Sequence, residues 1–350
     1  MVVQETLIPF LYMSKNGVDA GNTFDGAISM NSSSWMYFPT GRTEERGRGR
    51  GLMIGNLLSG TVYNTVQYIS IQSMGNAIDF GDASTVIRNN GAVASSTRAL
   101  SAGGSTPSNV DTIDFFTIAT ASNATDFGNL TAVKASPYPT GNQTRGIWAG
   151  AYNYPAGVYT IDYVTIASTG NAADFGDRLN SIHSSNRSQC NSTTRGLITG
   201  GYNPSPGAMV NIIEKLEIAT TGNTTDFGDL SSPRNNMGAL SSNTRGIIYG
   251  GSGASPTPNV NIIDFVTIAT TGDATDFGDL IGNTSSFANS CTSNNIRGIS
   301  AGGDTQPGNY YTNTIQHITI ATTGNASDFG DMLRAGAYFS TTSDSHGGLS

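Results

Sequence analysis

The sequence has few charged residues, and lysine is the scarcest of them. Of its 350 residues 12% are charged, the lysines are Lys15, Lys134 and Lys215, and the formal net charge is −8. Domains that bind nucleic acid need clustered Lys and Arg to displace counterions from phosphates. The composition therefore argues against nucleic acid as a partner, and the single basic run, 45–51, is interpreted as a solvated hinge.

Long apolar segments are missing, and histidine is rare. No apolar run reaches 18 residues and no basic leader precedes a small-residue cleavage site, so neither a membrane span nor a secretory signal is expected. His183, His317 and His346 lie in unrelated positions, without a serine or cysteine in a recognisable nucleophile setting. We expect no catalytic residue, no cofactor and no enzymatic activity.

What the sequence does contain is a repeat. The segment TTGDATDFGD (270–279) occurs in six variants, whose DFG aspartates are 47 to 52 residues apart. A period near 50 is typical of the blades of a propeller. The first aspartates of the six copies are Asp79, Asp126, Asp174, Asp226, Asp276 and Asp328.

Each unit contains further elements that keep the same period. An arginine opens a short apolar run that ends in glycine, as in RGIIYGG, and a segment such as IDFVTIAT (263–270) alternates around β-branched residues. With a Ser/Asn-rich segment such as MGALSSN (237–243), each unit supplies about four short strands, and no helical period is sustained. The repeat arginines are Arg50, Arg98, Arg145, Arg195, Arg245 and Arg297.

Six units of four strands predict an all-β fold, a six-bladed β-propeller with a short non-repeating N-terminal arm. We expect the arm at 1–45 and the propeller at 46–350. The chain enters at the Arg50 strand without a Ser/Asn-rich partner, and residues 335–350 match that missing strand. The C-terminal strand is therefore expected to close the ring.

The acidic turns and the arginines allow a functional interpretation as well as a structural one. Calcium needs about six to eight oxygen ligands, whereas each DFGD turn offers two aspartates, and Asn129 replaces one of them in one copy. We favour architecture over a metal site: phenylalanine packing between blades, glycine allowing the bend, and the preceding Asn or Asp bonding to backbone.

The repeat arginines also allow a functional interpretation. Sialidases bind a carboxylate with arginines from several blades, but here every unit has one arginine at the same position. Each arginine is expected to have one structural partner, with the DFG aspartate as the favoured one.

The two cysteines belong to equivalent strands of units that are not neighbours. Cys190 and Cys291 lie five and six residues before a repeat arginine. A disulfide needs Cα atoms within about 7 Å of each other. Two buried free thiols are therefore expected.

Residues 1–45 do not match the repeat and contain two apolar clusters, 7–13 and 35–39. Exposed strands of this kind can add to the sheet of another protein. The arm is expected either to fold back on the propeller or to dock on a neighbouring chain in an oligomeric assembly. The partner-binding residues expected in it are Phe10, Leu11, Tyr12, Trp35, Tyr37 and Phe38.

The repeat resembles that of kelch propellers, with a GG doublet after the second strand, an aromatic residue in the third, and Pro233-Arg234 before the first. It departs from that family because the tryptophan late in the blade is absent. Galactose oxidase shares the kelch fold, but its cross-linking cysteine and copper-binding histidines have no counterpart here.

The wording TIATTGNATDFGDL is similar to that of virion proteins of tailed phages that infect marine cyanobacteria and similar hosts. This resemblance covers about 50–350 and implies a non-enzymatic structural protein, located in the virion at the surface of the tail, neck or head. Its partners would be other virion proteins, bound through the arm. The alternative is a receptor-binding adhesin or tail fibre protein that recognises host surface glycans through loop residues. The tyrosines expected in that role are Tyr152, Tyr154, Tyr310 and Tyr311.

Overall fold

A computed structural model describes the chain in two separate units, Met1–Arg48 and Gly49–Ser350. Within the first unit, the described residues form an antiparallel hairpin of β1 (Gly26–Asn31) and β2 (Ser34–Pro39). The described residues are 26–31, 34–39, 49–153, 156–180, 189–204, 207–253, 260–281, 284–285, 290–305 and 310–349.

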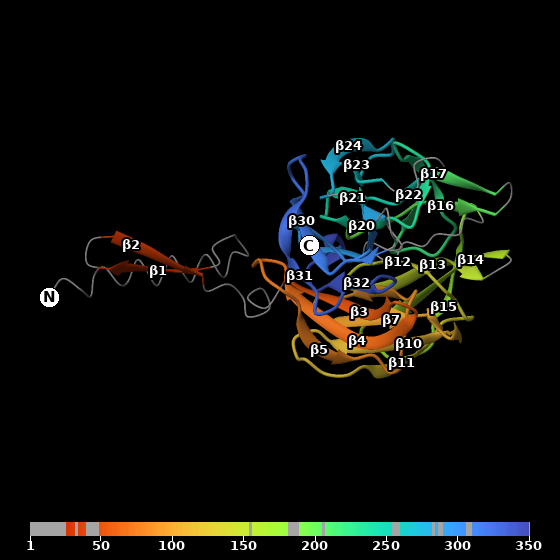
Figure 1. The fold of residues 1–350 in the computed structure, drawn as a ribbon, viewed down its shortest axis with the longest axis horizontal. Helices are drawn as coiled ribbons and strands as arrows, with labels where there is room; N and C mark the ends of the chain where they lie inside the picture. The colour runs from red at the N-terminus through yellow and green to blue at the C-terminus, as the bar shows by residue number, and fades with distance from the viewer. Residues whose placement is uncertain are drawn as a thin grey trace. The chain divides into compact units, whose positions relative to one another are not determined.

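The second unit is a six-bladed β-propeller, as the sequence predicts, and Figure 1 shows its sheets following one another around a ring. Strands are named here from the axis outward. Blade 1 contains β32 (Ser340–Ser343), β3 (Arg50–Leu58), β4 (Thr61–Ser70) and β5 (Ile78–Asp82). Blade 2 contains β6 (Gly91–Ala94), β7 (Arg98–Ala102), β10 (Thr112–Thr117) and β11 (Thr125–Asn129). Blade 3 contains β12 (Tyr138–Gly141), β13 (Arg145–Asn153), β14 (Ala156–Thr165) and β15 (Ala173–Asp177).

The remaining three blades follow the same order. In blade 4 the innermost segment around Asn191 makes a single bridge to Gly196, and the three strands outside it are β16 (Arg195–Asn203), β17 (Ala208–Glu217) and β18 (Thr225–Asp229). Blade 5 contains β20 (Gly238–Ser241), β21 (Arg245–Tyr249), β23 (Ile262–Thr267) and β24 (Thr275–Asp279). Blade 6 contains β26 (Ser290–Ser293), β27 (Arg297–Ala301), β30 (Thr314–Thr319) and β31 (Ser327–Asp331).

Short strands lie within the connections between these elements. They are β8 (Ser105–Thr106), β9 (Ser108–Asn109), β19 (Arg234–Asn235), β22 (Ser252–Gly253), β25 (Thr284–Ser285), β28 (Asp304–Thr305) and β29 (Tyr310–Tyr311). The one helical element in the described part of the chain is the 3-10 turn η1 (Gly347–Leu349). This fits the prediction that helix is nearly absent.

Blade 1 joins the two ends of the propeller. The last strand, β32, pairs antiparallel with β3, so that Gly51 lies opposite Ser343 and Ile54 opposite Ser340. The Ser/Thr-rich segment near the C-terminus thus occupies the innermost position that the first unit of the repeat leaves open. The arginine strand is the second from the axis in every blade.

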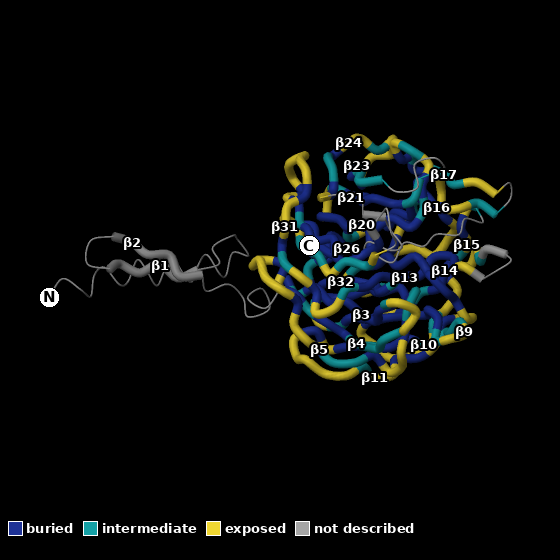
Figure 2. The backbone as a smooth tube through the Cα atoms, in the orientation of Figure 1, coloured by how far each residue is buried: buried dark blue, intermediate teal, exposed yellow. Residues whose placement is uncertain are grey.

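The core lies between consecutive blades. The phenylalanine of each DFG segment is buried there, and Phe80 of blade 1 packs edge-on against Phe116 of blade 2, with ring centroids 6.2 Å apart. The innermost strands are buried along their whole length, as the dark blue tube in Figure 2 shows, and most of their residues are small, Tyr138 of β12 being the largest exception. Small residues permit close packing of sheets around an axis.

Both cysteines are free and buried, as predicted. Burial raises the pKa of the Cys190 thiol to about 12 and also raises that of Cys291, so both remain neutral thiols. They act as small apolar residues in the inner strands.

Candidate functional site

The repeat arginines bind the next blade, and not the DFG aspartates. In each case Nη1 donates to a backbone carbonyl just after the third strand of the following blade, at 2.7–3.1 Å. Arg297 of blade 6 completes the circle by binding the Ile71 carbonyl of blade 1. The expectation of a DFG-aspartate partner is therefore wrong: a guanidinium fork fits the carbonyls where a strand ends and its hydrogen bonding stops.

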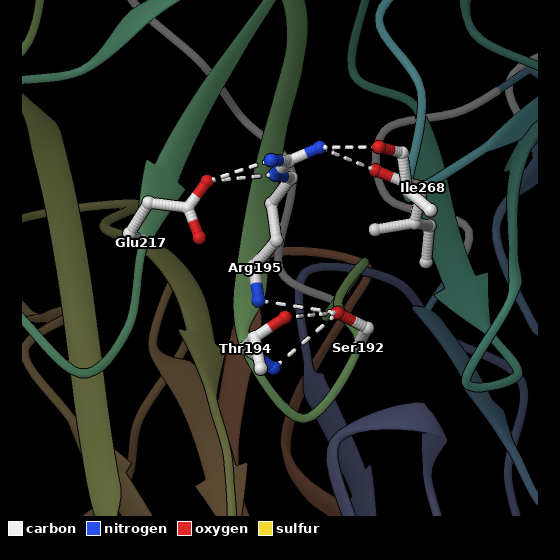
Figure 3. A network of polar contacts seen from close by, with 6 residues as sticks. Ser192, Thr194, Arg195, Glu217 and Ile268 are labelled. Carbon is white, nitrogen blue, oxygen red and sulfur yellow. Dashed lines mark hydrogen bonds and ion pairs between the residues drawn. The ribbon is translucent and has the colours of Figure 1, made fainter.

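An aromatic ring supports most of these guanidinium groups. Arg50 lies over Tyr68 with Cζ 4.6 Å from the ring centroid, and Arg245 lies over Phe265 at 4.8 Å. Blade 4 has Lys215 at the aromatic position, and there Arg195 instead pairs with Glu217, its Nη2 2.8 Å from Oε1 (Figure 3). In blade 6 His317 takes the aromatic position and packs edge-on against Phe329, with ring centroids 5.9 Å apart.

The DFG segments form a second seam between the same blades. The backbone N–H two residues after each DFG phenylalanine donates to the Asn or Asp side chain of the next blade's turn, at 3.0–3.1 Å. Asp229 N donates to Asp273 Oδ1, for example, and Asp331 N donates to Asn76 Oδ1 across the closure. The expected side-chain-to-backbone bond is therefore present, and it joins two blades.

Glycine is required in this seam because the neighbouring backbone comes so close. A Cβ placed on Gly228, whose φ is +151°, would lie 2.3 Å from the carbonyl oxygen of Gly272. The first aspartate of every DFG segment is exposed, and this also holds for Asp126 of the copy that lacks a second aspartate. The sequence analysis favoured these carboxylates as partners of the repeat arginines, but in the structure they are exposed.

A third contact, which the sequence analysis missed, is a buried polar layer on the third strands. Each third strand carries Asp, Glu or Gln at one position, and the connector from the preceding blade binds it. Ser84 donates its N–H and its hydroxyl to Asp114 Oδ2, whereas Leu333, at the same position of its connector, donates only its N–H to Gln67 Oε1. The signal was present as the repeated acid in IDFF, IDYV, IEKL and IDFV.

Three of these carboxylates carry a buried cation as well. Lys134 Nζ lies 3.1 Å from Asp162 Oδ1, and Arg234 Nη2 lies 2.6 Å from Asp264 Oδ2, with both partners of each pair inaccessible. Arg178 pairs with Glu214 at 3.3 Å. Burial lowers the pKa of Lys134, and the charge and hydrogen bond of Asp162 oppose that shift.

Asp114 has no such cation among the described contacts. Ile87 occupies the connector position that Lys134 and Arg234 hold elsewhere, five residues after the outer strand ends. Burial raises the pKa of Asp114, the Ser84 hydrogen bonds oppose the rise, and the Asp126 charge adds to it. An acid in this setting costs free energy when it ionises.

The described residues contain no group of three or more His, Cys, Asp or Glu that could hold a metal ion. Over the same residues, no helix is both long and apolar enough to span a membrane.

The three loop tyrosines that the structure describes do not form one cluster. Tyr152 belongs to β13 of blade 3 and is 42% exposed, whereas Tyr310 belongs to β29 of blade 6, on the opposite side of the ring, and is 72% exposed. Tyr311 lies beside Tyr310, where partial burial and the nearby charge of Asp304 raise its pKa. Tyr154 lies outside the described residues.

Blades 3 and 4, which are neighbours in the ring, both carry exposed tyrosines, of which the sequence analysis named only Tyr152 among the described residues. Tyr152 and Tyr159 of blade 3 are exposed, and so is Tyr202 of the neighbouring blade 4. The signal for Tyr202 was its register, because AYN (151–153) and GYN (201–203) end equivalent strands. We call Tyr152, Tyr159 and Tyr202 the tyrosine surface.

The arm residues are placed only in part. Trp35, Tyr37 and Phe38 belong to β2, where Tyr37 lies opposite Ile28 and Phe38 opposite Ala27. Phe10, Leu11 and Tyr12 lie outside the described residues.

In comparisons with known proteins, no family model matches the chain, and neither does any curated protein.

Proposed function

We propose that this chain is a non-enzymatic structural protein of a phage virion, with a kelch-like propeller displayed on the particle and an N-terminal arm that attaches it. The observation that carries the proposal is the use of the repeat residues. All six arginines and all six DFG segments join neighbouring blades in the same way. Because these residues make the same contacts between blades in every copy, none of the six blades differs from the others in a way that would indicate a reactive site.

Composition supports the same function. With three lysines in 350 residues, the surface loses little side-chain entropy when it packs against another protein. The resemblance to virion proteins of tailed phages is the reason for proposing a phage virion as the particle. The separate hairpin unit supplies the means of attachment, since a lone two-stranded hairpin is marginally stable and gains from adding to another sheet.

The test is incorporation into the particle. Phage carrying the full chain and phage carrying a chain without residues 1–45 are purified, and the protein in each particle is counted by mass spectrometry. The proposal expects the shortened chain to be expressed, folded and absent from particles. Incorporation at the level of the full chain would contradict attachment through the arm.

The tyrosine surface favours a second candidate, a receptor-binding adhesin that recognises host glycans. Tyrosine rings stack on sugar faces, and these three exposed tyrosines belong to two adjacent blades. The discriminating measurement is binding of the purified full chain to host cells. Tyr152→Ala and Tyr202→Ala should each reduce binding, while Tyr310→Ala on the opposite blade serves as the matched control and should not.

A further inference from the structure

Three positions recur at every seam between blades, beside the contacts already described. One is the residue before the repeat arginine, and the other two lie in the turn that opens the DFG segment of the next blade. In the seam between blades 4 and 5 these residues are Thr194, Thr271 and Thr275, and all three are exposed. The arginine links the positions, because Arg195 Nη1 donates to the Ala269 carbonyl at 3.0 Å, just before that turn.

Small residues occupy these positions in five of the six seams. The residue before the arginine is threonine in blades 2 to 5 and Gly49 in blade 1, and the two turn positions hold Thr, Ala or Ser in blades 2 to 6. The seam between blades 6 and 1 differs at all three positions, which hold Ile296, Met74 and Ile78. The contacts that all six seams share do not require these changes, because they form equally well where the residues are small.

The three large side chains at this seam do not pack in the core. Ile296 is 70% exposed, Met74 60% and Ile78 55%, which places them among the most exposed large apolar residues in the described part of the chain. Large apolar residues that face water in a group mark sites of interaction with another protein. We call Met74, Ile78 and Ile296 the closure patch.

Hydrogen bonds between blades 6 and 1 bring the closure patch together. Arg297, the residue after Ile296, donates through Nη1 to the Gln72 carbonyl at 3.3 Å, two residues before Met74. Figure 1 shows this region where the blue and orange ribbons meet.

The turn of blade 1 is also held against the outer strand of blade 6. The N–H groups of Gly75 and Ala77 donate to carbonyls of β31 at 3.1 and 2.8 Å. Met74 and Ile78 are the residues on either side of this bonded segment. The two apolar side chains of the turn therefore border the junction of the two blades.

The chain enters the ring next to the closure patch. The carbonyl of Gly49, the first described residue of the ring, accepts the N–H of Ile71 at 2.6 Å. A Cβ on Gly49 would lie 3.1 Å from the side chain of Gln72. A protein that binds the segment before Gly49 is therefore held at high effective concentration near the closure patch.

The exposed charges that border the closure patch are negative. Asp79 follows Ile78 in β5, and Asp331 lies beside the bonded turn in β31, and both are exposed. The guanidinium of Arg297, by contrast, is engaged with carbonyls of blade 1 and lies over the ring of Phe329. A complementary partner surface has an apolar centre and lysine or arginine at its edge.

We propose that the closure patch is a second contact with the virion protein that binds the N-terminal arm, and that this protein presents there an apolar surface edged with lysine or arginine. The proposal rests on the proposed function, from which it takes attachment to a particle. Three side chains are too few for a stable dimer of this chain, which needs about 1,200 Å² or more of buried surface. A patch of this size suits a contact that adds to the binding of a tethered segment.

The test compares particles made with the wild-type chain and with Met74→Thr/Ile78→Thr/Ile296→Thr. Each threonine stands at the same position in another seam, so this triple variant should keep the wild-type melting temperature. Its copies per particle, counted by mass spectrometry, should fall on the order of tenfold or more, because burial of even one such side chain contributes about that factor to binding. Leu179→Thr/Ile281→Thr, the matched control, removes exposed apolar side chains from two connectors and should be incorporated like the wild type.

Oxidation of methionine reports on the closure patch without any substitution. Met74 is exposed and Met209 of β17 is partly exposed, so dilute hydrogen peroxide should oxidise both in the isolated full chain. In particles, the oxidation of Met74 should slow on the order of tenfold while that of Met209 does not change. Peptide mass spectrometry measures both rates.

Incorporation of the triple variant at the wild-type level would overturn the proposal and leave attachment through the arm intact, and so would equal oxidation of Met74 in the isolated chain and in particles. Slow oxidation of Met74 in the isolated chain would mean that another part of this chain covers the patch, and equal protection of Met209 in particles would mean unspecific burial; each contradicts the proposal. Absence of the wild-type chain from particles would overturn the proposed function itself. If the triple variant does not fold, the oxidation of Met74 in wild-type particles decides.

Discussion

The seams between blades and the buried polar layer beneath them join the same pairs of sheets, but they repeat to different degrees. Every seam uses a backbone carbonyl, a backbone N–H or a glycine, and all six copies are alike. The polar layer always has a side chain on the third strand, but its partner changes from Lys134 to Arg178 to Ser84 around the ring, and in two copies the donor is only a backbone N–H. A contact to a neighbour's backbone restricts the residue type at one position only, because every residue has the same backbone. A contact between two side chains can differ from blade to blade as long as both residues change together.

This pairing is visible in the identity of the partners. Where the third strand carries Asp114, Asp162 or Asp264, the connector supplies Ser or Thr, whose hydroxyl also donates. Where it carries Gln67 or Gln316, the connector residue is Leu or Ile and only its N–H donates. A carboxylate accepts more hydrogen bonds than an amide oxygen, so the extra donor accompanies the acid.

The largest effect is expected from deleting the strand that closes blade 1. Removing residues 335–350 deletes β32 and leaves blade 1 without its innermost strand. The melting temperature, followed by circular dichroism, should fall by roughly 10 °C or more, if the ring folds at all. Removing residues 1–45 is the control and should leave the ring's melting temperature unchanged; a similar fall in both would mean that the two units stabilise each other.

Within the variable layer, Lys134→Met should cost roughly 3–5 kcal/mol in the free energy of unfolding, because it leaves Asp162 buried without its cation. Chemical denaturation measures this change. The double variant Lys134→Met/Asp162→Asn removes both charges and should recover most of the loss. A double variant as unstable as the single one would show that lysine packing, and not charge pairing, is what stabilises this contact.

Within the repeated seam, Gly228→Ala should destabilise the ring by roughly 2–3 kcal/mol, because its Cβ would strike the Gly272 carbonyl. Gly222→Ala is the matched control: its φ of +157° is similar, but nothing lies within 4 Å of its Cβ. Unfolding free energies of the two variants separate conformational strain from the seam contact. Equal losses would indicate strain alone.

Arg245→Ala should cost about 1–2 kcal/mol, through loss of its hydrogen bonds to the Ile320 and Ala321 carbonyls and of its packing on Phe265. Arg245→Lys should recover part of that loss. Thermal melts of both variants provide the measurement. If alanine caused no change, the arginine seam would contribute only to local geometry.

The smallest effect, and the one with the clearest pH signature, is expected at Asp114. Its folded pKa is raised by burial, so its contribution to stability is full below the unfolded pKa of 3.8 and is lost as pH rises through the folded pKa. Asp114→Asn removes that loss, so the variant should gain stability relative to the wild type as pH increases above about 4. If the stability difference between Asp114→Asn and the wild type were the same at pH 3 and pH 7, burial of Asp114 would not be destabilising its ionised form.

Much of the architecture followed from the sequence, because it depends on local patterns repeated six times. The period near 50, the alternation in IDFVTIAT and the unmatched segment 335–350 predicted the six blades and the strand that closes them. The DFG phenylalanine was expected between blades, and the Asn or Asp of the turn was expected to bond to backbone. Both depend on side-chain chemistry that acts over a few residues.

Only the tertiary structure showed which residues far apart in the sequence contact one another. Arg245 binds carbonyls about 75 residues further along the chain, and no local pattern distinguishes them from the nearer Asp276. The sequence also could not place Tyr202 beside blade 3 and Tyr310 opposite it. Those distances depend on how the ring closes, and its curvature is the sum of all six blade contacts rather than a property of any one segment.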